Sequence, residues 1–292
     1  DALYVESYLE APRHIEVQVM ADQQGNMVHL FERECSVQRR YQKIIEEAPS
    51  AALSESDRKK VTALALDLIR GIGYTSAGTV EFLMDGDRNF YFLEMNTRIQ
   101  VEHPVTEMIL GIDLVKEQIT ISEGHPLSFR QEDLVIRGFA MESRLYAENP
   151  EKDFLPSSGR IDSLELPTGN GVRVDSGYRQ GNLVEPWYDP MLAKIIVHGK
   201  NREEARIHKI KALKEVRITG LSTNRDFLVG LLRSDVFREN RIFTRLIDEK
   251  YQTLRKQLQE QRGQHDLETL LAAATLIALH RPENGNREPV SP

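Results

Sequence analysis

The segment of residues 79–107 constrains the fold of this chain more than any other. It reads TVEFLMDGDRNFYFLEMNTRIQVEHPVTE, in which two runs of alternating polarity flank the turn-rich residues 85–89. Side chains of a strand alternate between two faces, so this pattern is typical of two strands joined by a tight turn. The sequence therefore predicts a β-hairpin in this segment.

The register of this hairpin brings acidic side chains together. Pairing Met84 with Tyr91 aligns the two strands. Glu81 then lies opposite Glu94, and Asn96 shares a face with Glu94. Two like charges directly across a hairpin repel each other, and a cation would remove the conflict. Two carboxylates and an amide oxygen suit a hard ion such as Mg²⁺, so we expect a metal site here.

The residues after the second strand, 97–104, alternate polar and apolar side chains and end at a proline. In an extended segment, Arg98, Gln100 and Glu102 point the same way. A cation, an amide and a carboxylate beside a metal suit an oxyanion that must be held and deprotonated. Two simpler interpretations stay open: a solvated edge strand with an Arg–Glu pair, or a different hairpin register in which one glutamate pairs with Arg98.

Composition narrows the class of protein. The 292 residues carry 38 basic and 45 acidic side chains, a net charge of −7 that offers no basic surface for nucleic acid. The sequence contains no apolar run long enough to span a membrane and no signal-peptide pattern. Cys35 is the only cysteine, which excludes an intramolecular disulfide and indicates a reducing, cytoplasmic location.

A second hairpin is predicted within residues 12–49. His14, Glu16 and Gln18 alternate with apolar residues, the turn residues 22–26 follow, and a second strand returns from residue 28. A polar run then comes at residues 38–43, which by itself is typical of a solvated surface.

Helices are predicted where apolar residues recur at helical spacing. Ser54, with Asp57 three residues on, caps a helix that ends near Gly71, and further helices are expected after Pro104, from 113 to 123, from 201 to 217 and from about 223 to 234. Short strands follow Pro126, so we expect a domain boundary near residue 128. Residues 245–262 and 266–280 form two more predicted helices, which pack on their own domain or dock on a partner.

The run EMNTRIQVEHPVTE, residues 94–107, closely resembles the biotin carboxylase family, a branch of the ATP-grasp enzymes. The segments PRHIEVQV, ERECSVQRR and EEAPS are also similar to segments of that family. The resemblance covers about residues 1–248 and implies an α+β fold. Residues 1–127 would be the C-terminal part of an ATP-grasp domain, an antiparallel sheet with helices. Residues 128–248 would be the biotin carboxylase C-terminal domain, and residues 249–292 a helical extension and disordered tail.

The resemblance implies an ATP-dependent ligase. Bicarbonate attacks the γ-phosphate of MgATP to give carboxyphosphate, which breaks down to CO₂ and phosphate; phosphate takes the N1′ proton of biotin, and the resulting enolate captures CO₂. The implied cofactors and substrates are ATP, Mg²⁺ or Mn²⁺, bicarbonate, and biotin on a carrier. The implied partners are a biotin carboxyl carrier protein or domain and a carboxyltransferase subunit, and a homo-oligomer is compatible with the family.

The resemblance also implies roles for individual residues. Glu102 corresponds to the base for bicarbonate, and Arg144 to the group that stabilises the biotin enolate; Arg98 and Lys43 complete the implied catalytic set. From the residues alone, Arg144 would instead be a structural ion pair with Glu142 or Glu148. The implied bicarbonate site contains Lys43, Arg98, Gln100, Val101 and Glu102. The implied metal ligands are Glu81, Glu94 and Asn96. The implied nucleotide pocket contains Glu6, Leu9, His14, Gln38, Leu83 and Leu221. Tyr41 departs from the histidine common in bacterial single-subunit enzymes.

Two further segments indicate which type of carboxylase the sequence resembles. Residues 172–177 and 187–194 look more like acyl-CoA carboxylases acting on propionyl- or methylcrotonyl-CoA, enzymes linked to fatty acid metabolism, than the free-standing acetyl-CoA type. Pyruvate or urea carboxylase is the nearest alternative, and a non-catalytic assembly module is the alternative outside enzymes. The family has an upstream nucleotide-fold domain and a lid with a glycine-rich loop, which this sequence lacks. We therefore expect the chain to be a fragment that does not turn over alone.

Overall fold

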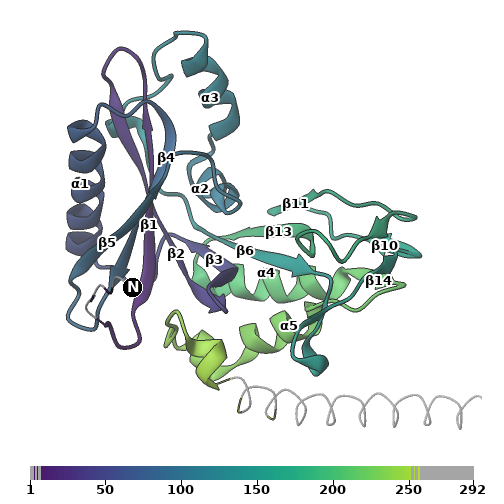
Figure 1. Cartoon of the computed structure of the whole chain (residues 1–292). Helices are drawn as coiled ribbons and strands as arrows, with labels where there is room; N and C mark the ends of the chain where they lie inside the picture. Colours follow the sequence, from purple (N-terminus) through teal and green to yellow (C-terminus); the bar gives the residue numbers. More distant parts are fainter. Residues whose placement is uncertain (1–2, 4, 6–7, 251–252, 254–255, 257–292) are drawn as a thin grey trace, which may run out of the picture. The chain divides into compact units, whose positions relative to one another are not determined.

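The computed structural model describes residues 3, 5, 8–250, 253 and 256 of the chain (Figure 1). The chain divides into two compact units, residues 1–249 and residues 250–292. Residues 246–250, within the helix predicted for 245–262, are helical; the rest of that helix, apart from residues 253 and 256, and the helix predicted for 266–280 lie outside the described residues. Within the part of the chain that is described, no helix combines the length and the apolar character needed to cross a membrane.

An eight-stranded sheet forms the centre of the first unit, with strand order β11-β13-β6-β3-β2-β1-β4-β5. Every neighbouring pair is antiparallel. The strands are β1 (Arg13–Ala21), β2 (Met27–Arg39), β3 (Gln42–Ala48), β4 (Ser76–Met84), β5 (Phe90–Asn96), β6 (Phe139–Tyr146), β11 (Val172–Ser176) and β13 (Met191–Gly199). This antiparallel sheet with helices confirms the predicted α+β class. The sheet continues across residue 128, and the domain boundary there stays a prediction.

The helices are α1 (Glu55–Gly71), α2 (His103–Leu110), α3 (Leu114–Ser122), α4 (Arg202–Glu215), α5 (Arg225–Arg233) and α6 (Asp235–Arg238). Ser54 and Asp57 form a reciprocal capping box at the start of α1, as the sequence predicts. Gly111 ends α2 in the left-handed conformation, with φ of 71°, which glycine adopts without steric strain.

Short elements connect these parts. They are β7 (Glu148–Asn149), β8 (Leu155–Pro156), β9 (Gly159–Arg160), β10 (Ser163–Glu165), β12 (Leu183–Val184), β14 (Arg217–Thr219) and the 3₁₀ helices η1 (Gln131–Asp133) and η2 (Pro150–Lys152). The strands among them pair as β7 with β8, β9 with β12, and β10 with β14, outside the central sheet.

The two faces of strands β1 and β4 have different characters. One face packs on α1, where Ile15, Val17, Val80 and Phe82 join residues of the helix in an apolar core. Because strand side chains alternate, the residues between them point to the opposite face. That face is apolar only at one end, where Met20 joins a second core together with Val105 and Ile109 of α2. At its other end lie the polar residues of the candidate site.

The hairpin of β4 and β5 differs from the predicted register. Glu81 lies opposite Glu94, as predicted, but Met84 pairs with Phe90 and not with Tyr91. The register shifts between Glu81 and the next residue of β4, which leaves Leu93 as an extra residue in β5. Such a bulge changes the register on one side only, so the prediction was wrong near the turn and right at the acidic pair.

Residues 97–102 do not continue as an extended segment. His103 N donates to Gln100 O, which makes a turn, and α2 begins at His103. Pro104 lies in the first turn of this helix, a position that suits its fixed φ and its missing N–H. The polar run of residues 38–43 is also not simply a solvated surface, because Gln38 and Arg39 are buried, whereas residues 40–42 are exposed.

Candidate active site

Lys43 lies at the centre of a network of buried carboxylates. Its Nζ lies 2.5 Å from Glu16 Oε2, 2.6 Å from Glu102 Oε1 and 3.1 Å from Glu81 Oε1. Glu16 and Glu81 are direct partners on β1 and β4, and Glu102 directly precedes α2, so three separate parts of the chain supply the acids. Burial alone would lower the pKa of Lys43, but these carboxylates raise it well above its usual value. The side chain is therefore a fixed positive charge.

Arg33 supports the network from inside the protein. It is fully buried and lies opposite Glu16 on β2, with Nε 2.5 Å from Glu16 Oε1. Its other nitrogens donate to side-chain oxygens of four neighbours, at 2.7 to 3.1 Å: Gln18, Thr79, Gln100 and Thr106. Burial opposes the ionisation of Glu16, but Arg33 and Lys43 outweigh it and lower the pKa of Glu16 to about 2.

Glu102 connects Lys43 with Arg144. Its Oε2 accepts from Arg144 Nη2 at 2.9 Å, while Arg144 Nε donates to Glu46 Oε1 at 2.6 Å. The side chains of Lys43 and Arg144 are each 12% exposed, whereas that of Glu102 is 2% exposed. A buried carboxylate thus lies between two cations that still reach the surface. This arrangement can hold an oxyanion beside a base.

The three predicted metal ligands lie together. Asn96 Nδ2 is 3.0 Å from Glu81 Oε1 and 3.0 Å from Glu94 Oε1, so one amide joins the two carboxylates. Glu81 is buried, Asn96 is half-buried and Glu94 is exposed, so the group leads from the network to the surface. Two carboxylates and an amide that open to solvent fit a hard divalent cation that keeps water and phosphate in its shell. The grouping of these residues was correctly predicted; their role as ligands stays a prediction.

A second group could in principle hold a metal, because ligand atoms of His14, Glu16 and Glu81 lie within 4.8 Å of one another. His14 Nδ1 is 2.8 Å from Gln38 Nε2, which donates, so the ring proton belongs on Nε2. That nitrogen lies 2.6 Å from Glu81 Oε2, in close electrostatic contact with it. Burial raises the pKa of Glu81, but the neighbouring His14 and Lys43 outweigh this effect and lower the pKa to about 2. Because Lys43 already binds both carboxylates, this group is better described as part of the ionic network.

The predicted nucleotide residues are only partly brought together. His14 contacts Gln38 and lies opposite Leu83 on β4, so these three share one region. Leu9 and Leu221 are half-buried, and no described contact joins them to that group. Glu6 lies outside the described residues. Tyr41 is 83% exposed at the turn between β2 and β3.

The residues of the predicted bicarbonate site are also only partly brought together. Gln100 is buried and donates to Glu81 Oε1 at 2.7 Å, and the carbonyl of Val101 accepts from Lys194 Nζ at 2.7 Å. Arg98 is exposed, and its Nη1 donates to the carbonyl of Ile99 at 3.2 Å. The expectation that Arg98 points the same way as Gln100 and Glu102 was wrong for this structure, because the segment turns and does not run as a strand.

Several charged residues in and beside the network were missed by sequence reasoning. Glu16, Arg33 and Glu46 belong to the network, Lys194 binds the carbonyl of Val101, and Glu142 is buried on β6 without a hydrogen-bond partner among the described residues. A usable signal existed for some of them: charged residues at every second position of an otherwise apolar strand, as at Glu16 on β1 and at Glu142 and Arg144 on β6. On a buried sheet such residues need partners on neighbouring strands.

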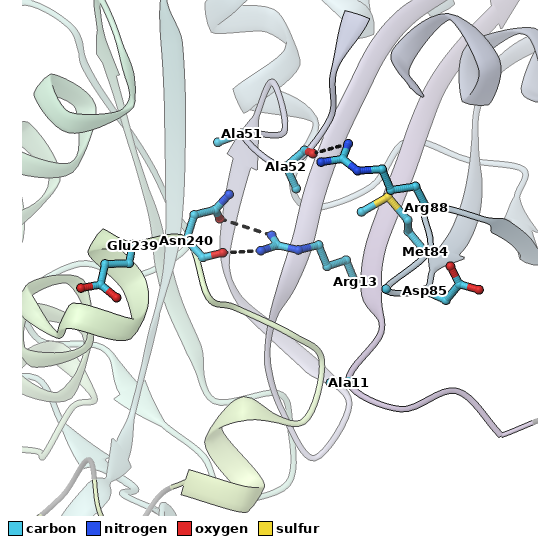
Figure 2. Close-up of a pocket in the computed structure, with 10 residues that line it drawn as sticks. Ala11, Arg13, Ala51, Ala52, Met84, Asp85, Arg88, Glu239 and Asn240 are labelled. Carbon is cyan, nitrogen blue, oxygen red and sulfur yellow. Dashed lines mark hydrogen bonds between the residues drawn. The ribbon is translucent and has the colours of Figure 1, made fainter. Parts of the chain in front are cut away.

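A cavity of about 350 Å³ lies elsewhere on the first unit (Figure 2). Arg13 Nη1 reaches Asn240 Oδ1 at 3.3 Å across it, and Arg88 Nη1 donates to the carbonyl of Ala52 at 3.2 Å. None of the predicted site residues lines it. Its arginines are already paired within the protein, so we place the chemistry at the Lys43 network.

Comparison with protein families defines the class. Residues 1–130 match the family model of the carbamoyl-phosphate synthase L chain, ATP binding domain. Residues 142–249 match the model of the biotin carboxylase C-terminal domain. An ATP-grasp part is therefore followed by a biotin carboxylase C-terminal part.

Individual relatives are subunits of carboxylases. A pyruvate carboxylase subunit of Methanothermobacter thermautotrophicus is 51% identical over 248 residues, which are 85% of this chain and 50% of that protein. The mitochondrial methylcrotonoyl-CoA carboxylase alpha subunit of Dictyostelium discoideum is 46% identical over 290 residues, 99% of this chain and 41% of that protein. The chain belongs to the biotin carboxylase family, and it spans about half the length of the curated relatives it matches.

A solved structure shows the same fold. The biotin carboxylase domain dimer of the Hydrogenobacter thermophilus 2-oxoglutarate carboxylase, in complex with MgADP, ADP and bicarbonate, has a TM-score of 0.82 and 44% identity. The match covers 85% of this chain and 55% of that chain.

Proposed function

We propose that this chain forms part of the active site of a biotin carboxylase, which carboxylates biotin through carboxyphosphate with ATP and bicarbonate. The observation that carries the proposal is Glu102, a buried carboxylate held between Lys43 and Arg144. A solved relative that binds MgADP and bicarbonate supports the choice of ligands. A non-catalytic assembly module is a weaker alternative, because buried ion pairs add little to stability and a structural scaffold does not need this many.

The proposed first step is proton transfer to Glu102. Bicarbonate binds beside Lys43 and Arg144, and Glu102 takes its O–H proton as the bicarbonate oxygen attacks the γ-phosphorus of ATP and ADP leaves. Both cations are fixed by carboxylates before substrate arrives, so little reorganisation is needed when charge develops. Glu81, Glu94 and Asn96 would hold Mg²⁺ or Mn²⁺. When bound, the ion would neutralise part of the negative charge of the ATP phosphates.

The second half of the reaction centres on Arg144. Carboxyphosphate breaks into CO₂ and phosphate, and phosphate removes the N1′ proton of biotin. The negative charge then moves to the ureido oxygen of biotin, and N1′ attacks CO₂. A guanidinium already held by Glu46 and Glu102, yet 12% exposed, suits stabilisation of that oxygen. The biotin would arrive on a carrier protein or domain, with a carboxyltransferase as the further partner and a homo-oligomer as the assembly.

For the holoenzyme we propose an acyl-CoA carboxylase. The methylcrotonoyl-CoA carboxylase relative aligns with 99% of this chain, so the similarity extends past residue 250, whereas the pyruvate carboxylase relative aligns with 85%. Pyruvate carboxylase remains the second candidate, because that relative has the higher identity, 51% against 46%. Assay of the assembled holoenzyme with an acyl-CoA and with pyruvate distinguishes the two.

The test of the biotin carboxylase proposal is ADP release from MgATP by the full-length polypeptide that carries this sequence. We expect release that requires bicarbonate and increases with free biotin. Omission of each ligand in turn is the control. ADP release that is unchanged without bicarbonate would contradict the proposal.

A further inference from the structure

Glu142 is a buried acidic residue to which the proposed reaction assigns no role. It lies on β6, two residues before Arg144 and on the same face of the strand. Its exposure is 0%, and neither of its carboxyl oxygens has a hydrogen-bond partner. An isolated carboxylate in such a place is strongly disfavoured, so the group either finds a partner or stays neutral.

Glu46 lies directly opposite Glu142 where β3 pairs with β6. Side chains in this relation have Cβ atoms about 4.5–5.5 Å apart, within reach of each other for two glutamates. Glu46 is also fully buried; its Oε1 accepts from Arg144, while its Oε2 has no partner. Two buried carboxyl groups therefore face each other, and each has at least one oxygen without a hydrogen-bond partner. One proton between them satisfies an atom on each side.

The other charged groups around Glu142 do not replace that proton. They come from β6, the start of α2, β13 and α4, and are Arg144, Glu102, Lys194 and Lys209. Lys194 Nζ instead binds the carbonyl of Val101 at 2.7 Å and Asp175 Oδ2 at 3.2 Å, and Lys209 Nζ donates to the carbonyl of Ile195.

The electrostatics agree with this geometry. Burial and the neighbouring Glu46 raise the pKa of Glu142 well above its usual range. Burial also raises the pKa of Glu46, but Arg144 opposes that shift. Because Arg144 donates to Glu46 and no cation among the described residues donates to Glu142, the proton belongs mainly to Glu142 and the negative charge to Glu46.

We propose that Glu142 is a neutral carboxylic acid that donates a hydrogen bond to Glu46 Oε2 and so positions Glu46 against Arg144. Glu142 is then a positioning residue, which acts on the reaction through Glu46 and the Arg144 guanidinium. The link to catalysis rests on the proposed function, whereas the protonation of Glu142 does not. An ionised Glu142 would place a second negative charge beside Arg144 and draw the guanidinium away from Glu102.

Infrared spectroscopy of the full-length polypeptide tests the protonation without any need for turnover. The carbonyl stretch of a protonated carboxylic acid should be present near neutral pH in the wild type and lost in Glu142→Gln. Glu46→Gln is the matched control, which should keep the band at a shifted position, because the acid remains and its acceptor changes. A wild-type spectrum that loses no such band in Glu142→Gln overturns the proposal.

Kinetics test the positioning. An amide at position 142 still donates to Glu46, so Glu142→Gln should keep kcat for bicarbonate-dependent ATP cleavage within about twofold. Leucine leaves Glu46 Oε2 without a donor, so Glu142→Leu should lower kcat about tenfold with an unchanged KM for MgATP. Equal kcat values for Glu142→Leu and wild type overturn the positioning role. If the wild type itself is inactive, the proposed function fails, and the infrared result still decides whether Glu142 is protonated. If Glu142→Leu does not fold, Glu142→Gln alone tests the positioning role. A tenfold loss of kcat in Glu142→Gln then overturns the proposal.

Discussion

The two faces of strands β1 and β4 are stabilised in different ways, one by apolar packing and the other by paired charges. Toward α1, Ile15, Val17 and Phe82 exclude water and need no particular partner atom. On the other face, Glu16 and Glu81 are equally buried but depend on named cations and donors. Burial of apolar area tolerates small changes, whereas a buried charge that loses its partner is left uncompensated. One set of strands thus supplies both a core and a candidate active site, and substitutions should separate the two.

The largest difference is expected for activity. Glu102→Gln removes the proposed base but keeps the size of the side chain, so bicarbonate-dependent ATP cleavage should fall about 10²–10⁴-fold. Binding of MgATP should change little, because Glu102 binds Lys43 and Arg144, neither of which is a predicted nucleotide residue. Steady-state kinetics and nucleotide titration of the full-length polypeptide measure both. Unchanged turnover would remove Glu102 from the role of base.

The next effect is on stability. Arg33→Met removes one of the two cations that bind the buried Glu16 and should lower the free energy of unfolding by about 3–5 kcal/mol. Ile15→Val, on the apolar face of the same strand, is the comparison and should lower it by about 0.5–1.5 kcal/mol. Urea denaturation of both variants measures the difference. Equal losses would mean that the two faces do not differ as described.

Acid should weaken the charged face selectively. The pKa of Glu16 is lowered from 4.5 to about 2, so the folded state binds fewer protons than the unfolded state between these values. The stability from this ionisation is therefore complete above about pH 4.5 and is lost as pH falls toward 2, a change of about 3 kcal/mol. Denaturation at several pH values should show a smaller acid loss for Glu16→Gln than for wild type. Ile15→Val should shift the whole curve and keep its shape.

The smallest effect is expected for charges that remain in water. Lys59 and Glu55 form an i,i+4 pair on α1, 3.3 Å apart, with side chains 76% and 78% exposed. Lys59→Gln should change the free energy of unfolding by about 0.5 kcal/mol or less, because solvent screens such pairs. Thermal unfolding at low and high salt checks this. A loss as large as that of Arg33→Met would show that burial is not what separates the two kinds of ion pair.

Local pattern predicted much of the fold. The capping box at Ser54 and the hairpin turns follow from rules that act within a few residues. The pairing of Glu81 with Glu94 was also predicted, although the predicted register was wrong near the turn. The bulge at Leu93 and the turn at residues 97–102 were missed, because both depend on how the segments pack against the rest of the sheet.

The candidate site was also predicted only in part. The resemblance of residues 94–107 to a known family identified Glu102 and the metal group, and Glu94 and Asn96 are near neighbours in sequence. Lys43, by contrast, binds acids 27, 38 and 59 residues away. Nothing in the local pattern around any of these residues says which carboxylate meets which cation.

The sequence by itself determined the family, the class of fold and the alternation that gives each strand an apolar and a polar face, because these are encoded in short runs of residues. The tertiary structure alone decided that Arg33 is buried against Glu16 and that Glu142 faces Glu46. It also decided that Arg98 lies at the surface. The physical reason is that burial and partner choice arise from strand order: β3 lies between β2 and β6, and only this order brings residues 46 and 142 together.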